Sequence, residues 1–322
     1  MAGLLTFYEL RQKTYSGDGM IVVLSGGTGT PKLLQGLMEV IPQEEIRVII
    51  NTAEDHWLPH GYFSPDVDTV LYTLSGLIDD KIWHGINGDT YHTHERLLKL
   101  GYREPLRIGD LDRATHIHRG ELMRGGRTLS EAIALQVEKM GIKSRVFPMS
   151  DDAVETVILT PKGKLSFHEF WVDNLGTPEV NGVFFRGIEK ARGCRGALRA
   201  IDEADGVIIG PSNPVSSILP IISIKDIRDR LASRRKRVAI SPIIGCKPVS
   251  GPADKFLQGM GYESSSSSVA AMYQGLVDHF IIDNEDNTLI QGVCVHKAET
   301  LMRCLEDKKR LVEFTLKVLD LF

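Results

Sequence analysis

Two aspartates that lie one residue apart have the type and spacing to do chemistry. Asp66 and Asp68 belong to the run Ser64–Thr69. One of them can cap the helix that follows, because a carboxylate at a helix start accepts hydrogen bonds from free backbone N–H groups. The other carboxylate is then available to orient a substrate hydroxyl or to hold a divalent cation. Asp55, in the segment before this run, is a further candidate ligand for the cation.

A glycine-rich turn near the start of the chain joins an apolar run to a helical pattern. The run Ile21–Leu24 does not alternate, which is typical of a strand buried on both faces. Pro31 suits the first turn of a helix, where no amide donor is required. A strand that passes through such a turn into a helix leaves N–H groups pointing outward beside the positive end of the helix dipole. We therefore expect the turn to bind phosphate through Gly27, Thr28, Gly29, Thr30 and Lys32.

Two established phosphate-binding motifs come close to this turn, and neither is complete. The P-loop ends in Gly-Lys-Ser/Thr, whereas this chain has Pro31-Lys32-Leu33, so the hydroxyl that holds magnesium is missing. The dinucleotide fingerprint needs three glycines, and Lys32 stands at the third position. A plain strand-to-helix turn stays an alternative. A cation in the first turn of a helix is unfavourable, because it lies at the positive end of the helix dipole. A lysine at position 32 therefore indicates another purpose and favours an anion site.

Composition limits the class of protein. The 322 residues have 42% hydrophobic and 25% charged side chains, as in an ordinary globular protein. The formal net charge of −4 argues against nucleic acid as the main partner. No apolar run approaches the ~20 residues of a membrane span, so we expect no membrane partner. Residues 1–19 lack a signal-peptide pattern and are interpreted as an N-terminal extension.

The cysteines are scattered without the Cys-x-x-Cys spacing of a metal or redox site. This pattern indicates reduced thiols in a cytoplasmic protein, and neither a disulfide framework nor a zinc site. The four residues are Cys194, Cys246, Cys294 and Cys304.

Apolar runs that end in glycine or polar residues recur along the chain and predict its fold class. They lie at residues 47–52, 145–152, 206–214 and 237–245. In an open parallel sheet, ligands bind beyond the carboxyl ends of the strands, so Ser212 and Asn213 join the predicted phosphate site. We expect an α/β fold, with a Rossmann-like, mostly parallel sheet, helices on both faces and an inserted helical subdomain.

The predicted core is interrupted by one insertion. Residues 20–69 and 142–322 form the Rossmann-like nucleotide- and phosphate-binding core, and residues 70–141, which show short helical patterns, form the inserted helical subdomain. Within the core, a β-hairpin is predicted over 156–171, and its aromatic residues are either core or a wall for a flat ring. The serine run 264–268 is predicted to be a loop, and residues 298–319 a closing helix.

Inside the predicted insertion, the charged run Arg107–His116 is either a solvated loop or a place for an anionic ligand. Four histidines suggest a metal site, but each pair is two residues apart and shares no helix face at i,i+4. We therefore expect all four at the surface; they are His92, His94, His116 and His118.

Seven segments between Ser25 and Lys255 match one family in the family's own order. Together they closely resemble the 2-phospho-L-lactate transferase family. The pair Cys246-Lys247 departs from the small polar pair expected there. The matching segments are SGGTGTPKLLQG, NTAEDHW, SPDVDTVLY, RIGDLDRATH, PMSDD, GPSNPVSSILPIISI and SPIIGCKPVSGPADK.

The resemblance implies a magnesium-dependent transferase of coenzyme F420 biosynthesis. Its donor is lactyl-2-diphospho-5'-guanosine, its acceptor is the ribityl hydroxyl of the deazaflavin Fo, and its products are coenzyme F420-0 and GMP. The resemblance also implies that Asp68 and Arg107 hold Fo, although lysine is more usual at the second position. We further expect Asp68 to orient the acceptor hydroxyl, Asp55 or Asp66 to hold Mg²⁺, and Trp171 to contact the deazaflavin.

Several alternatives stay open. The same fold family contains non-catalytic regulators that bind a nucleotide sugar, and some transferases of the family take a phosphoenolpyruvyl donor. An NAD dehydrogenase is disfavoured, because the fingerprint breaks at Lys32 and no ribose-reading acid follows the second strand at the usual distance. A homodimer is expected only because dimers are frequent.

Overall fold

The structure is a computed structural model, and it describes residues 19–104, 106–245, 247–249 and 251–321. At its centre is a seven-stranded sheet in the order β14-β13-β10-β9-β1-β2-β5, and every neighbouring pair is parallel. The predicted α/β fold class is therefore confirmed. The strands are β1 (Ile21–Ser25), β2 (Ile46–Ile50), β5 (Arg145–Pro148), β9 (Gly206–Ile209), β10 (Arg237–Ile240), β13 (His279–Asp283) and β14 (Cys294–Ala298).

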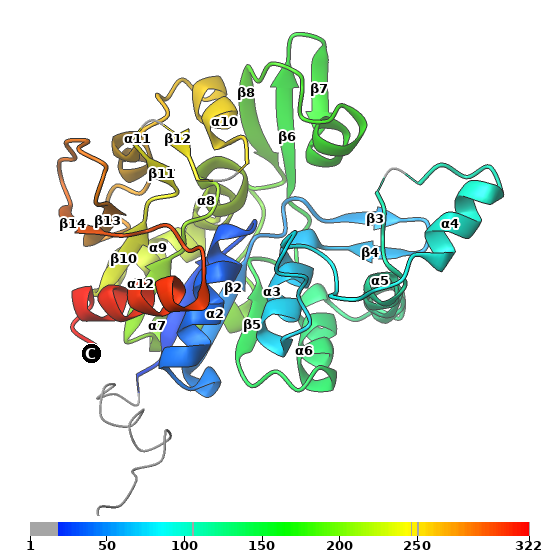
Figure 1. Cartoon of the computed structure of the whole chain (residues 1–322), viewed down its shortest axis with the longest axis horizontal. Helices are drawn as coiled ribbons and strands as arrows, with labels where there is room; N and C mark the ends of the chain where they lie inside the picture. The colour runs from blue at the N-terminus through cyan, green and yellow to red at the C-terminus, as the bar shows by residue number, and fades with distance from the viewer. Residues whose placement is uncertain (1–18, 105, 246, 250, 322) are drawn as a thin grey trace, which may run out of the picture.

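Helices cover both faces of this sheet (Figure 1). Successive residues of β1 alternate between two apolar clusters, because side chains of a strand point alternately to opposite faces. Ile21 and Val23 pack with α2 (Gly29–Val40), α3 (Pro65–Ser75), α6 (Leu129–Lys139) and α12 (Leu305–Val318). Val22 and Leu24 pack with α7 (Arg195–Glu203), α8 (Leu219–Ser223), α9 (Lys225–Ser233), α10 (Ala253–Gly259) and α11 (Ser266–Met272).

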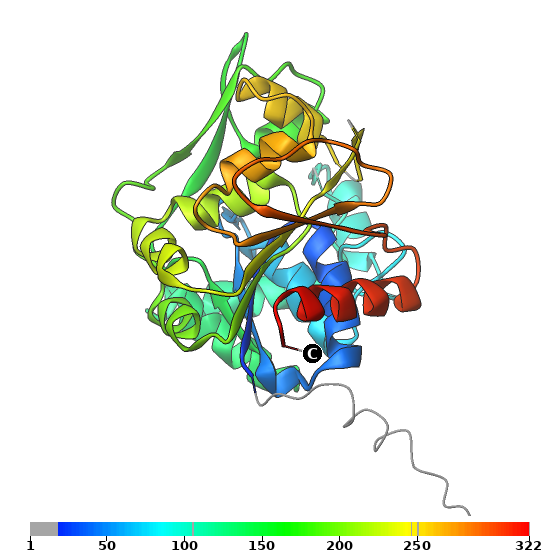
Figure 2. The ribbon, with the colours of Figure 1, turned by 90° about the vertical axis from the view of Figure 1, so that its left-hand side faces the viewer.

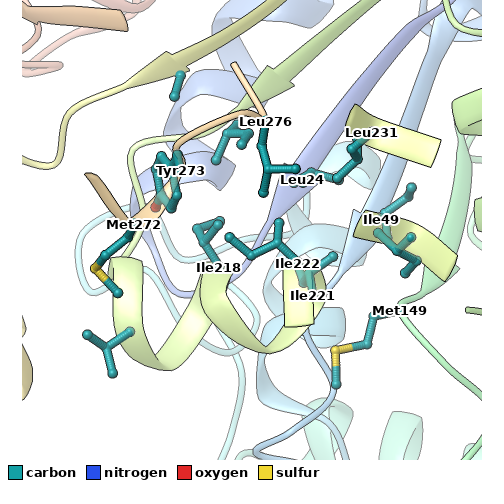
Figure 3. Packing of buried hydrophobic residues seen from close by; sticks show 14 of the residues in the cluster. Leu24, Ile49, Met149, Ile218, Ile221, Ile222, Leu231, Met272, Tyr273 and Leu276 are labelled. Carbon is teal, nitrogen blue, oxygen red and sulfur yellow. The ribbon is translucent and has the colours of Figure 1, made fainter. Parts of the chain in front are cut away.

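The close view in Figure 3 shows part of the second cluster, where Leu24 and Ile49 of the sheet face Ile221 and Ile222. On the other face, α12 lies beside α2 (Figure 2). No helix among the described residues is both long enough and apolar enough to cross a membrane.

The segment between β2 and β5 contains a short hairpin and then helices. The hairpin pairs β3 (His56–Leu58) with β4 (Gly61–Phe63), and α4 (His92–Lys99) and α5 (Asp110–Arg124) follow α3. Val70 of α3 and Ile133 of α6 are fully buried in the core cluster, whereas α4 lies at the far side from the central sheet (Figure 1). The predicted boundary between residues 69 and 70 falls inside α3, and the division into domains stays a prediction.

A second, three-stranded antiparallel sheet has the order β7-β6-β8. The predicted hairpin is present as β6 (Glu155–Thr160) and β7 (Gly163–Ser166), and β8 (Gly182–Arg186) adds to it. The second strand of the hairpin is shorter than predicted. After Ser166 the chain enters the π-helical turn η2 (Glu169–Asp173), which carries Phe170 and Trp171.

Two further predictions near the C-terminus are wrong. The serine run is not a loop: Ser265 accepts a hydrogen bond from the Ser268 N–H and so caps α11. The closing helix does not start at 298, because the edge strand β14 precedes it and α12 begins only at Leu305. The remaining elements are η1 (Gln43–Glu45), η3 (Pro214–Ile218), β11 (Ile243–Ile244) and β12 (Lys247–Pro248).

Candidate functional site

A cavity of about 420 Å³ opens where β1, β2 and β9 end. This is the carboxyl edge of the parallel sheet, the usual place for a ligand in such a fold. One part of its lining is polar and belongs to the loops after the strands and to the first turns of the helices that follow them: Gly27, Thr28, Gly29, Glu54, Asp66, Ser212, Asn213, Ser216 and Ser217. The other part is largely apolar and includes Phe63, Trp83, Leu106, Phe167, Trp171, Val172, Pro242, Pro252 and Phe256.

The predicted phosphate-binding turn faces this cavity, and glycine is required at two of its positions. Gly27 has a φ of +54°, which favours glycine. A Cβ on Gly29 would lie 1.9 Å from the carbonyl oxygen of Pro211, so only a hydrogen allows the two loops to approach this closely. Thr28 precedes α2, its side chain makes no capping hydrogen bond, and the first turn of α2 holds no acidic residue. The start of α2 is thus left without an anionic partner from its own turn.

Two of the residues predicted to bind phosphate instead join neighbouring loops. The Thr30 N–H donates to Ser212 Oγ over 3.1 Å, and the two hydroxyls lie 2.7 Å apart. Ser212 Oγ in turn donates to the carbonyl of Gly26. Ser212 lines the cavity but Thr30 does not. The buried side chain of Thr30 thus holds the β9 loop against the turn, and phosphate binding by Thr30 stays a prediction.

Asn213 and Lys32 were also predicted to bind phosphate, and each makes other contacts in the structure. Asn213 lines the cavity, but its Oδ1 accepts hydrogen bonds from Val215 N (3.0 Å) and Ser216 N (3.2 Å), which starts η3. Lys32 does not line the cavity, and its ammonium lies 5.2 Å from the ring centroid of Trp83. Burial lowers the pKa of Lys32. The structure therefore places Lys32 against a lining residue and outside the lining itself, and its contact with phosphate stays a prediction.

Asp66 lies at the polar end of the cavity and is almost fully buried. Its carboxylate accepts hydrogen bonds from the Gly27 N–H (2.7 Å) and from Asn51 Nδ2 (2.9 Å). Burial raises the pKa of Asp66 to about 6, although the two hydrogen bonds oppose this shift. A carboxyl group with a pKa near neutrality can accept a proton from a reacting hydroxyl.

Glu54 and Asp55 bring two more carboxyl groups to the end of β2. Burial, together with the nearby carboxylates, raises the pKa of both well above the usual range. The Ser64 hydroxyl donates to Asp55 Oδ2 over 2.6 Å, but the buried Oδ1 of Asp55 and Oε1 of Glu54 have no hydrogen-bond partner among the residues that the structure describes. A buried oxygen without a partner is costly, and protonation or a bound cation would remove that cost. The donor set therefore fits Mg²⁺, which prefers carboxylate oxygen.

The two predicted metal ligands line different cavities. Asp66 lines the first, whereas Asp55 lines a neighbouring cavity of about 680 Å³. Glu54 lines both, with His56, Phe167 and His168. The second cavity is acidic, since Asp55, Asp151, Asp152, Glu155 and Glu169 also belong to its lining. Glu54 is thus the carboxyl group that shares the first cavity with Asp66, and sequence reasoning missed it.

Asp68 does not line either cavity. Arg119 donates to both of its oxygens, at 3.3 Å to Oδ2, and His116 Nε2 lies 3.1 Å from Oδ2. Burial alone would raise the pKa of Asp68, but Arg119 and His116 lower it to about 2. Asp68, which was predicted to orient the acceptor hydroxyl, therefore lies outside the lining of both cavities, and its carboxylate forms a buried ion pair with Arg119.

The helix α5 supplies the partners of Asp68, and sequence reasoning missed them. His116 and Arg119 have no exposed surface, and Asp112 Oδ1 lies 3.2 Å from His116 Nε2. The prediction of a surface position is thus wrong for His116, and also for the buried His94, which pairs with Glu104. The available signal was the spacing of 112, 116 and 119, which puts all three side chains on one helix face.

The two residues predicted to hold Fo, besides Asp68, lie in different surroundings. Arg107 is exposed, its guanidinium lies 3.8 Å from the ring centroid of Tyr91, and it does not line the first cavity. Trp171 does line that cavity. Its ring stacks on the buried Phe170, with centroids 6.2 Å apart and planes 6° apart. This support holds the indole in place as a wall of the cavity.

Comparison with known proteins identifies the family. The model of the family "2-phospho-L-lactate transferase CofD" matches residues 21–319. A 2-phospho-L-lactate transferase from Methanosarcina acetivorans is 47% identical over 93% of this chain and 99% of its own length. One from Methanocaldococcus jannaschii is 47% identical over 91% and 96%. A crystal structure of a UPF0052 family member from Bacillus halodurans shares the fold, with a TM-score of 0.65 at 17% identity over 92% of this chain and 99% of that one. The chain belongs to the 2-phospho-L-lactate transferase family.

Proposed function

We propose that this protein transfers the 2-phospholactyl group of lactyl-2-diphospho-5'-guanosine to the terminal ribityl hydroxyl of Fo, which gives coenzyme F420-0 and GMP. One observation carries the proposal. The Gly27 N–H and the carboxylate of Asp66 meet over 2.7 Å beside the start of α2, in a cavity whose other part has an aromatic wall. A phosphate-binding turn, a carboxylate for a hydroxyl and a wall for a flat ring are what this transfer needs.

The donor would bind through its diphosphate at the turn before α2. The backbone N–H groups there and the positive end of the α2 dipole attract an anion. The tight contact of Gly29 with Pro211 keeps the turn close to the loop that carries Ser212 and Asn213. Because Asp66 now accepts from Gly27, a bound phosphate would compete with this carboxylate for the same amide. This competition couples donor binding to the position of Asp66.

Asp66 would orient the acceptor hydroxyl and take its proton. The hydroxyl oxygen forms a bond to the phosphorus that bears the lactyl group, and the bond from that phosphorus to the bridging oxygen breaks, so that GMP leaves with the electron pair. Transfer of this kind depends on in-line placement and charge stabilisation more than on a strong base. A pKa of about 6 leaves Asp66 ionised at neutral pH and able to accept the proton.

Mg²⁺ would be held by Glu54, with Asp55 beside it, and when bound it would neutralise charge on the diphosphate. This assignment is supported by the unpartnered oxygens of Glu54 and Asp55. Magnesium usually takes one or two carboxylates together with substrate phosphates, so a complete protein cage is not required. We further propose that the deazaflavin ring of Fo stacks on Trp171, in the apolar part of the cavity.

The test is to incubate the full chain with Fo, Mg²⁺ and one donor at a time, and to analyse the product by mass. We expect F420-0 from the lactyl donor. If product forms only from the phosphoenolpyruvyl donor, the proposed lactyl donor is wrong and the phosphoenolpyruvyl compound is the donor. Binding of either donor or of a nucleotide sugar without any transfer to Fo would overturn the proposal in favour of a regulator.

A further inference from the structure

Three metal-ligating side chains gather at the edge of the sheet opposite the cavity. β13 begins at His279 and β14 begins at Cys294, and the parallel register places these two residues side by side. His296 stands two residues further along β14, so all three side chains point to the same face of the sheet. Parallel strands begin at one edge and end at the other. The cluster therefore lies towards the amino ends of the strands, away from the Asp66 site.

The geometry of this cluster is close. One ligand atom from each of the three side chains lies within 4.8 Å of the other two. His279 Nδ1 and His296 Nε2 are 2.9 Å apart, a hydrogen bond in which one ring donates its only N–H proton to the other. The two imidazoles are half-buried and the Cys294 thiol is exposed. Phe314 of α12 contacts the His296 ring edge-on, with centroids 6.5 Å apart.

The chemistry of the donor atoms selects the ion. Two imidazole nitrogens and one thiolate suit Zn²⁺ and disfavour Mg²⁺ and Ca²⁺, which prefer oxygen. The other cluster of three such groups among the described residues is Asp68, Asp112 and His116, where Arg119 already supplies a cation.

We propose that His279, Cys294 and His296 bind one Zn²⁺ ion, with the fourth coordination position open to water. On binding, the Cys294 thiol loses its proton to solvent, the ring that donated the hydrogen bond exchanges that N–H proton for one on its other nitrogen, and three metal–ligand bonds replace bonds from Zn²⁺ to water. The ion would tie the edge strand β14 to β13. The cysteine spacing along the sequence does not predict this site, because strand register and not Cys-x-x-Cys spacing brings the ligands together.

The experiment measures Zn²⁺ binding to the full chain by calorimetry, after chelation of bound metal and with excess Mg²⁺ to occupy carboxylate sites. We expect one equivalent of Zn²⁺ to bind the wild type and to raise its melting temperature. Cys294→Ser and His296→Gln should each weaken binding by at least ~10-fold and remove that increase. Cys304→Ser, which changes another exposed thiol outside the cluster, is the matched control and should behave as the wild type.

Co²⁺ provides a second measurement that depends on the sulfur ligand. The wild type and Cys304→Ser should show thiolate-to-cobalt charge-transfer absorption, and Cys294→Ser should not. The proposal is overturned if the wild type binds no Zn²⁺, if both cluster variants bind it as tightly as the wild type, or if the cobalt complex lacks that absorption. Circular dichroism before metal addition shows that each variant is folded.

Discussion

The substitution Asp68→Asn removes the charge that neutralises a guanidinium with no exposed surface. Arg119 is 0% exposed and donates to both oxygens of Asp68. The amide of Asn can still accept a hydrogen bond, but it carries no charge. Loss of one partner from a buried ion pair typically costs about 3–5 kcal/mol of unfolding free energy. We expect a value of about 3 kcal/mol here, because Asp55 also attracts Arg119 and partly compensates for the loss.

The measurement is thermal unfolding followed by circular dichroism at pH 7.5. A loss of about 3 kcal/mol corresponds to a fall of roughly 6–12 °C in the melting temperature of a large domain. The matched control is Asp112→Asn, which removes a carboxylate that also contacts His116 but that forms no ion pair with an arginine among the described residues. Its side chain is 15% exposed, so we expect a loss of less than about half as much.

Activity separates this account from a direct role of Asp68 in the transfer. Any loss of transfer in Asp68→Asn should accompany the loss of stability and should be smaller at low temperature, where the variant is folded. The reasoning is refuted if Asp68→Asn has the same melting temperature as the wild type and still binds the donor, but transfers nothing to Fo. That result would indicate that Asp68 acts directly in the transfer.

Three further predictions concern stability, loop packing and the acceptor. Burial lowers the pKa of His116, but the neighbouring carboxylates of Asp68 and Asp112 outweigh burial and raise this pKa to about 9. The ring is therefore protonated in the folded state at pH values where the unfolded chain has lost its proton. The protonated ring stabilises the fold fully below pH 6.5, and roughly 3 kcal/mol of unfolding free energy is lost as the pH rises to 9. Denaturation of the wild type at several pH values in this range should show that loss. An equally steep dependence of the unfolding free energy on pH in His116→Gln would contradict the prediction. Gly29→Ala places a Cβ 1.9 Å from the carbonyl oxygen of Pro211, whereas ordinary contact begins at 3.4 Å. The turn before α2 and the loop after β9 must therefore separate by about 1.5 Å, and the transfer rate should fall by about 100-fold. Gly125→Ala, at a φ of −74°, is the control, and equal rates for the two variants would rule out the packing argument. Trp171→Ala should raise the KM for Fo by about 10-fold and leave the donor affinity unchanged; an unchanged KM for Fo would remove Trp171 from the acceptor site.

The parts of the fold that depend on local pattern could be predicted from the sequence. The uninterrupted apolar run of β1 and the glycine turn after it predict a buried parallel strand and a helix start, and both are present. The start of α6 also follows a local pattern, because Thr128 and Glu131 have the spacing of a capping box and form one. By contrast, β14 is an edge strand with half-exposed residues, and it lacks the apolar run that marks the central strands.

The interior of the site could be predicted less well, because it depends on pairings between distant segments. Asp68 has the spacing of a functional carboxylate, but its actual partner, Arg119, lies 51 residues away along the chain. Thr30 and Ser212 are 182 residues apart and hold each other through their hydroxyls. Sequence spacing indicates which groups can do chemistry. Only the fold decides that Asp66 lines the cavity and that Asp68 does not.

Asp66→Asn is the most direct test of the proposed reaction. With Fo, saturating Mg²⁺ and the lactyl donor, we predict that this variant forms F420-0 at least ~100-fold more slowly than the wild type, while it still binds the donor. The wild-type rate should also fall as the pH decreases through about 6, where Asp66 becomes protonated, and the residual rate of the variant should not. Transfer by Asp66→Asn at the wild-type rate would contradict the assignment of this carboxylate to the reacting hydroxyl.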